Sequence, residues 1–107
     1  IVYSFRKGLE TCIDLVPGKI KETAINEPLI NWHSFDGDEA LYAIYQSGGS
    51  AFNVSDEKMI KMTRYLREKE GLNVLPASVA GLVALMDMNE KEDLEPDRYV
   101  AILTSRK

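Results

Sequence analysis

The spacing of apolar residues predicts four helices, at residues 1–11, 37–47, between Ser55 and Gly71, and 77–88. The short stretch at residues 51–54 and the continuous apolar run at residues 99–103 are predicted to be strands. The last run is typical of a central strand that is covered on both faces. Strands that alternate with helices predict an α/β fold, a layered α/β/α arrangement around a mainly parallel sheet.

Residues that favour helix ends support these limits. Asp36 is placed to cap the helix at 37–47, and Gly48-Gly49 supplies the permissive residues that end it. Ser55 is an N-cap candidate for the third helix, and Pro76 suits the first turn of the fourth, which is apolar nearly all round and is expected to be buried on several sides. The buried stripe of the third helix is predicted to be Met59, Ile60, Thr63 and Leu66.

Composition narrows the class of protein. The 107 residues suit one domain, and a single Cys12 with a single His33 argues against a disulfide framework and a zinc site. The net charge of −4 makes nucleic acid an unfavourable partner. No apolar run is long enough to span a membrane and no signal peptide is apparent, so we expect a soluble, cytoplasmic protein. Because the chain opens on Ile1 and not on methionine, we expect a piece of a larger protein.

The chain contains no complete catalytic motif, and two positions attract attention by their place in the predicted fold. Thr104 and Ser105 directly follow the last predicted strand, where open α/β sheets bind ligands. Ser78 lies at the start of a helix, where free N–H groups suit a polar or anionic group. An ordinary strand end and an ordinary first-turn serine are the alternatives.

Three other features have plainer explanations. Gly48-Gly49 is more typical of a helix C-cap than of a phosphate loop. His33 is interpreted as a packing or surface residue because no partner can be identified for it, and Cys12 as an inert thiol.

Several collinear segments carry a family resemblance: 54–59 (VSDEKM), 66–71 (LREKEG), 75–82 (LPASVAGL) and 99–107 (YVAILTSRK), with KETAI at 21–25 and ALYAIYQSGG at 40–49 upstream. Together they resemble the carboxyl-terminal part of the threonine synthases. These are members of the tryptophan-synthase-like, fold type II, pyridoxal-phosphate-dependent enzymes. The resemblance runs from about residue 21 to residue 104, most of the chain.

The resemblance implies that residues 1–107 are the carboxyl-terminal portion of a large cofactor-binding domain. In that family the lysine that forms a Schiff base with pyridoxal phosphate and the glycine-rich phosphate loop lie upstream, so the chain alone is expected to be inactive. By position, Thr104 matches the hydroxyl residue that contacts the pyridine nitrogen, and Ser78 matches a helix-start position that lines the same pocket. Ser105, where the family has glycine, is counted with this cofactor-binding set. Leu75 also departs from the family pattern, which has glutamate at this position. Arg106-Lys107 departs from the usual family sequence after the closing strand.

The implied reaction converts O-phosphohomoserine and water to threonine and phosphate. Two alternatives stay open: another enzyme of this fold, such as a serine or threonine dehydratase or a cysteine synthase, and a stand-alone α/β regulatory or interaction domain. The expected partner is a small amino-acid substrate, with neither nucleic acid nor membrane. Exposed sheet edges and helix faces predict self-association or a homo-oligomer.

Overall fold

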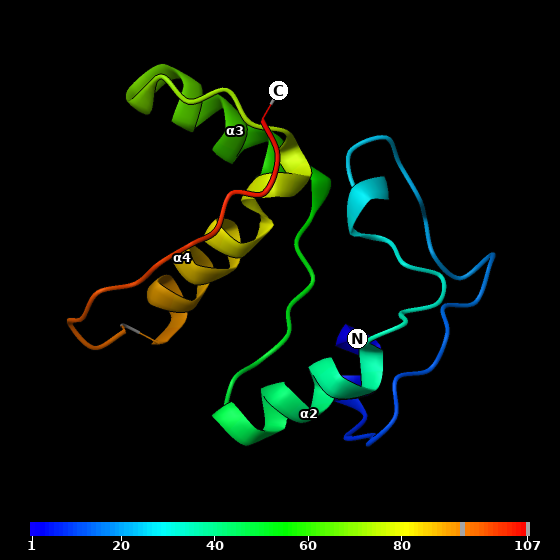
Figure 1. Ribbon diagram of the computed structural model, residues 1–107. Coiled ribbons are helices and arrows are strands. Elements are labelled where there is room, and N and C mark those ends of the chain that lie inside the picture. Colours follow the sequence, from blue (N-terminus) through cyan, green and yellow to red (C-terminus); the bar gives the residue numbers. More distant parts are fainter. Residues whose placement is uncertain (93, 107) are drawn as a thin grey trace. The chain divides into compact units, whose positions relative to one another are not determined.

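The computed structural model describes residues 1–92 and 94–106 (Figure 1). These residues form two compact units, one made of Ile1–Thr23 and Leu29–Asn53, the other of Ala24–Pro28 and the described residues from Val54 onward. Asp93 and Lys107, the last residue of the segment 99–107 that carries part of the family resemblance, lie outside the described residues. Among the described residues, no helix has the length and apolar character needed to cross a membrane.

The first unit contains two helices, α1 (Val2–Arg6) and α2 (Gly37–Ser47). The bounds of α2 agree with the prediction, and α1 is shorter than predicted. The rings of Phe5 and Tyr45 stack with centroids 5.6 Å apart, and the Tyr45 hydroxyl donates to the Leu9 carbonyl at 2.6 Å. Leu41, a residue of α2, is fully buried. The aromatic stack and the Tyr45 hydrogen bond therefore fasten α2 to the first residues of the chain.

The ends of α2 confirm one predicted cap and correct the other. Gly48 adopts a left-handed conformation, with φ 68°, and its N–H returns to the last carbonyls of the helix, so Gly48-Gly49 is a C-cap. Asp36 occupies the N-cap position, but its side chain makes no capping hydrogen bond. Asp38, in the first turn of α2, makes a different contact: its Oδ1 accepts the backbone N–H of Cys12 at 2.7 Å.

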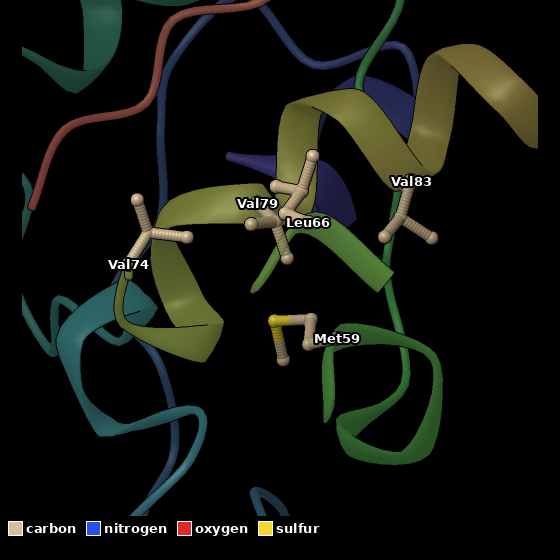
Figure 2. Packing of buried hydrophobic residues seen from close by; sticks show 5 residues of the cluster. All are labelled: Met59, Leu66, Val74, Val79 and Val83. Carbon is tan, nitrogen blue, oxygen red and sulfur yellow. The ribbon is translucent and has the colours of Figure 1, made fainter. Parts of the chain in front are cut away.

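The second unit is built from α3 (Asp56–Glu70), the 3-10 turn η2 (Pro76–Val79) and α4 (Ala80–Glu92); a further 3-10 turn, η1, covers Glu27–Leu29. Its core is one cluster of apolar side chains that point toward one another in Figure 2: Met59, Leu66, Val74, Val79 and Val83. These residues come from α3, η2, α4 and the segment before η2. The core is therefore helix packed on helix through a tight turn.

Helix α3 forms as the sequence predicts. Ser55 is in an extended conformation and its side chain accepts the Lys58 N–H at 3.2 Å, while Gly71 ends the helix with φ 67°. Of the predicted buried stripe, Met59 and Leu66 are buried and Thr63 is half-buried. Ile60 is exposed, and Met62 packs against the core in its place.

The predicted parallel sheet is wrong. No strand is present among the described residues, and only one isolated antiparallel bridge, between Val74 and Arg106, joins extended segments there. Residues 51–54 and 99–103 are irregular, and the side chains of Val100 and Ile102 are 88% and 77% exposed, not covered on both faces. A strand needs a neighbour for its backbone N–H and C=O groups, and neither segment finds one among the described residues.

The fourth predicted helix is also corrected. Pro76 begins the 3-10 turn η2, as its fixed φ favours, and α4 then continues to Glu92, beyond the predicted end at residue 88. The expected burial is found in η2, where Ala77, Ser78 and Val79 are buried. Among the described residues of α4 itself only Val83 is buried, and Met86 is 48% exposed, so this helix is not covered on several sides.

A salt bridge joins α3 to α4. Lys58 Nζ lies 2.8 Å from Asp87 Oδ2, and both side chains are partly exposed. The hydrogen bond to Asp87, its negative charge and a smaller contribution from Glu90 together raise the pKa of Lys58 above its ordinary value of 10.5. The pair therefore stabilises the fold at neutral pH, and solvent screening keeps its contribution small.

Met59 tests the core. Met59→Ala should lower the free energy of unfolding by about 2–5 kcal/mol, because Met59 is fully buried and the shortened side chain leaves a cavity. Met86→Ala is the matched control, since Met86 is 48% exposed and alanine favours a helix, and it should change stability by less than about 1 kcal/mol. Urea unfolding followed by circular dichroism measures both. Equal losses for the two variants would contradict this core.

Lys58 gives a pH-dependent prediction. Asp87→Asn should lower the pKa of Lys58, and Glu90→Gln should lower it less, because Asp87 supplies the larger interactions. A raised folded-state pKa contributes stability that is complete below the unfolded value and is lost as pH rises through the folded value. The stability difference between the parent and Asp87→Asn should thus shrink at strongly alkaline pH. NMR titration of the Lys58 side chain measures the shift; a pKa unchanged in Asp87→Asn is the contrary result.

Candidate functional site

The three residues singled out by sequence meet in the second unit. Leu75, in an extended conformation before Pro76, leads into η2, whose first turn is closed by the hydrogen bond from Ser78 N to the Leu75 carbonyl at 2.9 Å. Ser78 is only 5% exposed. After α4 the chain returns, drawn in red in Figure 1, so that Thr104 and Ser105 reach η2.

Ser78 Oγ is the centre of this hydroxyl cluster, defined as Ser78, Thr104 and Ser105. It accepts the backbone N–H of Ser105 at 2.6 Å and lies 3.2 Å from Thr104 Oγ1. In return, the Ser105 carbonyl accepts the Leu75 N–H at 3.2 Å, and Val74 forms a bridge with Arg106. The buried Ser78 hydroxyl and the Leu75 backbone N–H therefore anchor the carboxyl-terminal segment, each by one hydrogen bond to Ser105.

The hydrogen-bond inventory defines what the cluster can offer a ligand. Either hydroxyl of the Ser78–Thr104 pair can donate to the other. When Ser78 donates, its oxygen still accepts from Ser105, and the Thr104 hydroxyl proton remains for an outside acceptor. Thr104 is exposed whereas Ser78 is buried, so Thr104 is the member that can reach a ligand. A neutral O–H donor suits an uncharged nitrogen or oxygen acceptor.

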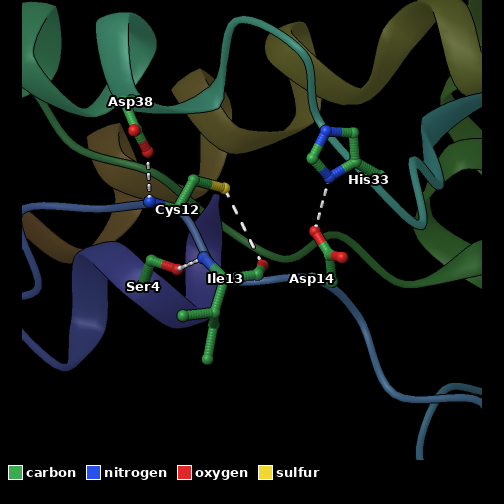
Figure 3. Close-up of polar contacts among 6 residues, drawn as sticks. All are labelled: Ser4, Cys12, Ile13, Asp14, His33 and Asp38. Carbon is green, nitrogen blue, oxygen red and sulfur yellow. Dashed lines mark hydrogen bonds and ion pairs between the residues drawn. The ribbon is translucent and has the colours of Figure 1, made fainter.

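Sequence reasoning missed a second polar group, in the first unit. His33 Nδ1 lies 2.7 Å from Asp14 Oδ1 (Figure 3). The His33 and Phe35 rings are nearly perpendicular, with centroids 5.1 Å apart. Both members of the pair are well exposed. The interpretation of His33 as a residue without an identifiable partner is therefore corrected. No sequence signal could have found Asp14, because 19 residues separate it from His33.

The surroundings of that pair are shallow. An open hollow of about 340 Å³ lies along the start of α2, lined by Ile1, Asn31, His33, Ser34, Phe35, Asp36, Gly37 and Ala40. Among the described residues, no three His, Cys, Asp or Glu side chains are grouped so that they could hold a metal ion. The hollow has no buried charged group, and the Asp14–His33 pair is best described as a surface contact.

Cys12 sits against the first residue of α2. A side chain at Gly37 would meet Cys12 Cβ at 2.6 Å and Sγ at 2.8 Å, so only glycine fits there. Cys12 is a free thiol that donates weakly to the Ile13 carbonyl, and the neighbouring Ile13 N–H donates to the buried Ser4 hydroxyl (Figure 3). These contacts make Cys12 part of the packing of the first unit, and its chemical inertness stays a prediction.

Comparisons with known proteins agree on one class of enzyme. A family model described as pyridoxal-phosphate dependent enzyme matches residues 5–105. The threonine synthase of Methanocaldococcus jannaschii is 33% identical over 105 residues, which is 98% of this chain and 25% of that protein. The threonine synthase of Methanosarcina acetivorans is 47% identical over 53 residues, 47% of this chain and 13% of that protein. No solved structure gives a significant match.

Ser78 tests the hydroxyl cluster without any ligand. Ser78→Ala leaves the Ser105 N–H without its acceptor, and this should lower stability by about 1–3 kcal/mol and speed hydrogen exchange of the Ser105 amide. Ser47→Ala is the matched control, because the exposed Ser47 hydroxyl only donates to the Ile44 carbonyl, and it should cost less than about 0.5 kcal/mol. An unchanged Ser105 exchange rate in Ser78→Ala would refute the anchoring role.

Proposed function

Because this chain belongs to the family of pyridoxal-phosphate dependent enzymes, we propose that it is the carboxyl-terminal part of a threonine synthase. The observation that carries the proposal is the 33% identity to a threonine synthase over 98% of the chain. The chain spans a quarter of the length of that relative. The proposed reaction releases phosphate from O-phosphohomoserine and adds water to give threonine, in the cytoplasm.

Thr104 is the residue proposed to meet the cofactor. When bound, pyridoxal phosphate supplies an electron sink for bonds at the substrate's amino-acid carbons. The exposed Thr104 hydroxyl would donate to the pyridine nitrogen, a neutral acceptor that a single O–H donor fits. A hydroxyl leaves that nitrogen unprotonated, whereas a carboxylate would hold a proton on it. A hydroxyl donor therefore lowers the electron-withdrawing power of the cofactor, which suits elimination and replacement chemistry.

Ser78 and Ser105 would act through Thr104. Ser78 Oγ accepts the Ser105 N–H, so its own proton can point to Thr104 Oγ1. That arrangement directs the Thr104 proton away from the protein and toward a ligand. We assign Ser78 as a positioning residue, and Ser105 as the backbone group that orients Ser78.

The chain by itself is proposed to be inactive. Its sequence contains no glycine-rich phosphate loop, and the resemblance places that loop and the Schiff-base lysine upstream of the matched region. The substrate of the whole enzyme would be a small amino acid. Self-association through exposed apolar faces is part of the same proposal, supported by the exposure of Val100 and Ile102.

The test uses the complete open reading frame that encodes this chain. The encoded enzyme should release phosphate from O-phosphohomoserine and form threonine, whereas the 107-residue chain incubated with pyridoxal phosphate should release none. Keto acid formed from serine or threonine, or cysteine formed from O-acetylserine and sulfide, would point to another enzyme of the fold and overturn the proposal. Phosphate release by the chain alone would overturn its proposed inactivity.

Two variants of the complete enzyme test Thr104. Thr104→Val removes the hydroxyl and should lower kcat at least about tenfold, with a shift in the absorbance of the bound cofactor, because one donor is lost at the reacting group. Thr63→Val is the matched control: the Thr63 hydroxyl donates to the Met59 carbonyl inside α3, so its loss should leave kcat and the spectrum unchanged. An unaltered spectrum in Thr104→Val would refute the contact.

A further inference from the structure

The backbone of Leu75 belongs to a closed ring of hydrogen bonds, defined by Leu75, Ser78 and Ser105. The Leu75 N–H donates to the Ser105 carbonyl at 3.2 Å, and the Ser105 N–H donates to Ser78 Oγ at 2.6 Å. The Ser78 N–H donates to the Leu75 carbonyl at 2.9 Å, which closes the ring. Each member both donates and accepts, and hydrogen bonds linked in this way strengthen one another. The loss of one bond should therefore weaken the other two.

The ring holds Ser105 on both sides of its Cα atom. The buried Ser78 hydroxyl accepts its N–H, and Leu75 donates to its C=O. With the Ser78 bond alone, the carboxyl-terminal segment could pivot about the Ser105 N–H, and the Leu75 bond removes that freedom. Thr104 is joined to Ser105 by a planar peptide bond, and its Oγ1 lies 3.2 Å from Ser78 Oγ. Fixing Ser105 therefore also fixes the direction from which Thr104 reaches Ser78.

Leu75 is able to donate this N–H because of the proline that follows it. A residue before proline favours the extended region, and Leu75 has φ −70° and ψ 145°. Leu75 is the N-cap of η2, so its N–H is not needed for a hydrogen bond within the turn. Val74 continues the contact by one residue, in the isolated antiparallel bridge with Arg106. The contribution of Leu75 thus comes from its backbone and not from its side chain.

We propose that Leu75 is a positioning residue for Thr104: its backbone N–H, acting through Ser105, sets the direction in which the Thr104 hydroxyl meets the pyridine nitrogen of the cofactor. The inference rests on the proposed cofactor contact of Thr104 and adds to it a residue that acts at one remove. The two fail separately, because hydrogen exchange in the cofactor-free enzyme reports on the ring, whereas phosphate release reports on the reaction.

A proline and an alanine at position 75 of the complete enzyme isolate the N–H. Proline fits φ −70° and removes the donor, whereas alanine keeps it. Both variants lose the leucine side chain, so its surroundings in the complete enzyme affect both alike. In the cofactor-free enzyme, Leu75→Pro should speed hydrogen exchange of the Ser105 amide about fivefold, and Leu75→Ala less than about twofold. Mass spectrometry with fragmentation to single amides measures both rates. Equal Ser105 exchange in the two variants would overturn the proposal.

The absorbance of the bound cofactor tests the path through Thr104. Leu75→Pro should shift the absorbance maximum in the same direction as Thr104→Val does, and Leu75→Ala should leave it in place. In a Thr104→Val background, Leu75→Pro should add no further shift, because the hydroxyl that it positions is already gone. A further shift in that background, or equal shifts in Leu75→Pro and Leu75→Ala, would show that Leu75 does not act through Thr104.

The unaltered enzyme gives a test that does not depend on the folding of any variant. In its cofactor-free form, the Leu75 and Ser105 amides should be protected from exchange to within about tenfold of each other, because the ring opens as a unit. A Leu75 amide that exchanges as fast as in an unstructured peptide, while the Ser105 amide stays protected, would refute the ring and the role of Leu75 with it.

Discussion

The contact between α3 and η2 is the interaction on which the second unit depends. Met59 and Val79 are both fully buried, and they lie in the cluster that also receives Val83 from α4. Because η2 is held there, Ser78 is held too, and the carboxyl-terminal segment can reach a fixed acceptor. The hydrophobic contact between α3 and η2 therefore fixes the position of Ser78 in the hydroxyl cluster.

The helices were predictable because their information is local. Ser55, Gly48 and Gly71 act within a few residues of the ends they define, and the apolar spacing of α3 identified Met59 and Leu66 as core residues. The sheet was not predictable in the same way, because a strand depends on a distant neighbour. Residues 99–103 have the composition of a buried strand, yet their outward side chains are exposed.

The candidate site shows the same division. Family resemblance and position along the chain selected Ser78, Thr104 and Ser105, and the structure brings them together. Their cofactor contacts stay a prediction. The exchange of hydrogen bonds between Ser78, Ser105 and Leu75 could not be read from sequence, because it requires residues 26 or more positions apart to meet. The Asp14–His33 pair was missed for the same reason.

The close approach of Gly37 to Cys12 also restricts how this protein can vary. A methyl group at position 37 would overlap the Cys12 side chain, so the start of α2 would have to move away from it. That movement would lengthen the hydrogen bond between Asp38 and the Cys12 N–H. Positions 12 and 37 are therefore sterically coupled: any side chain at 37 must displace the one at 12 or move the backbone.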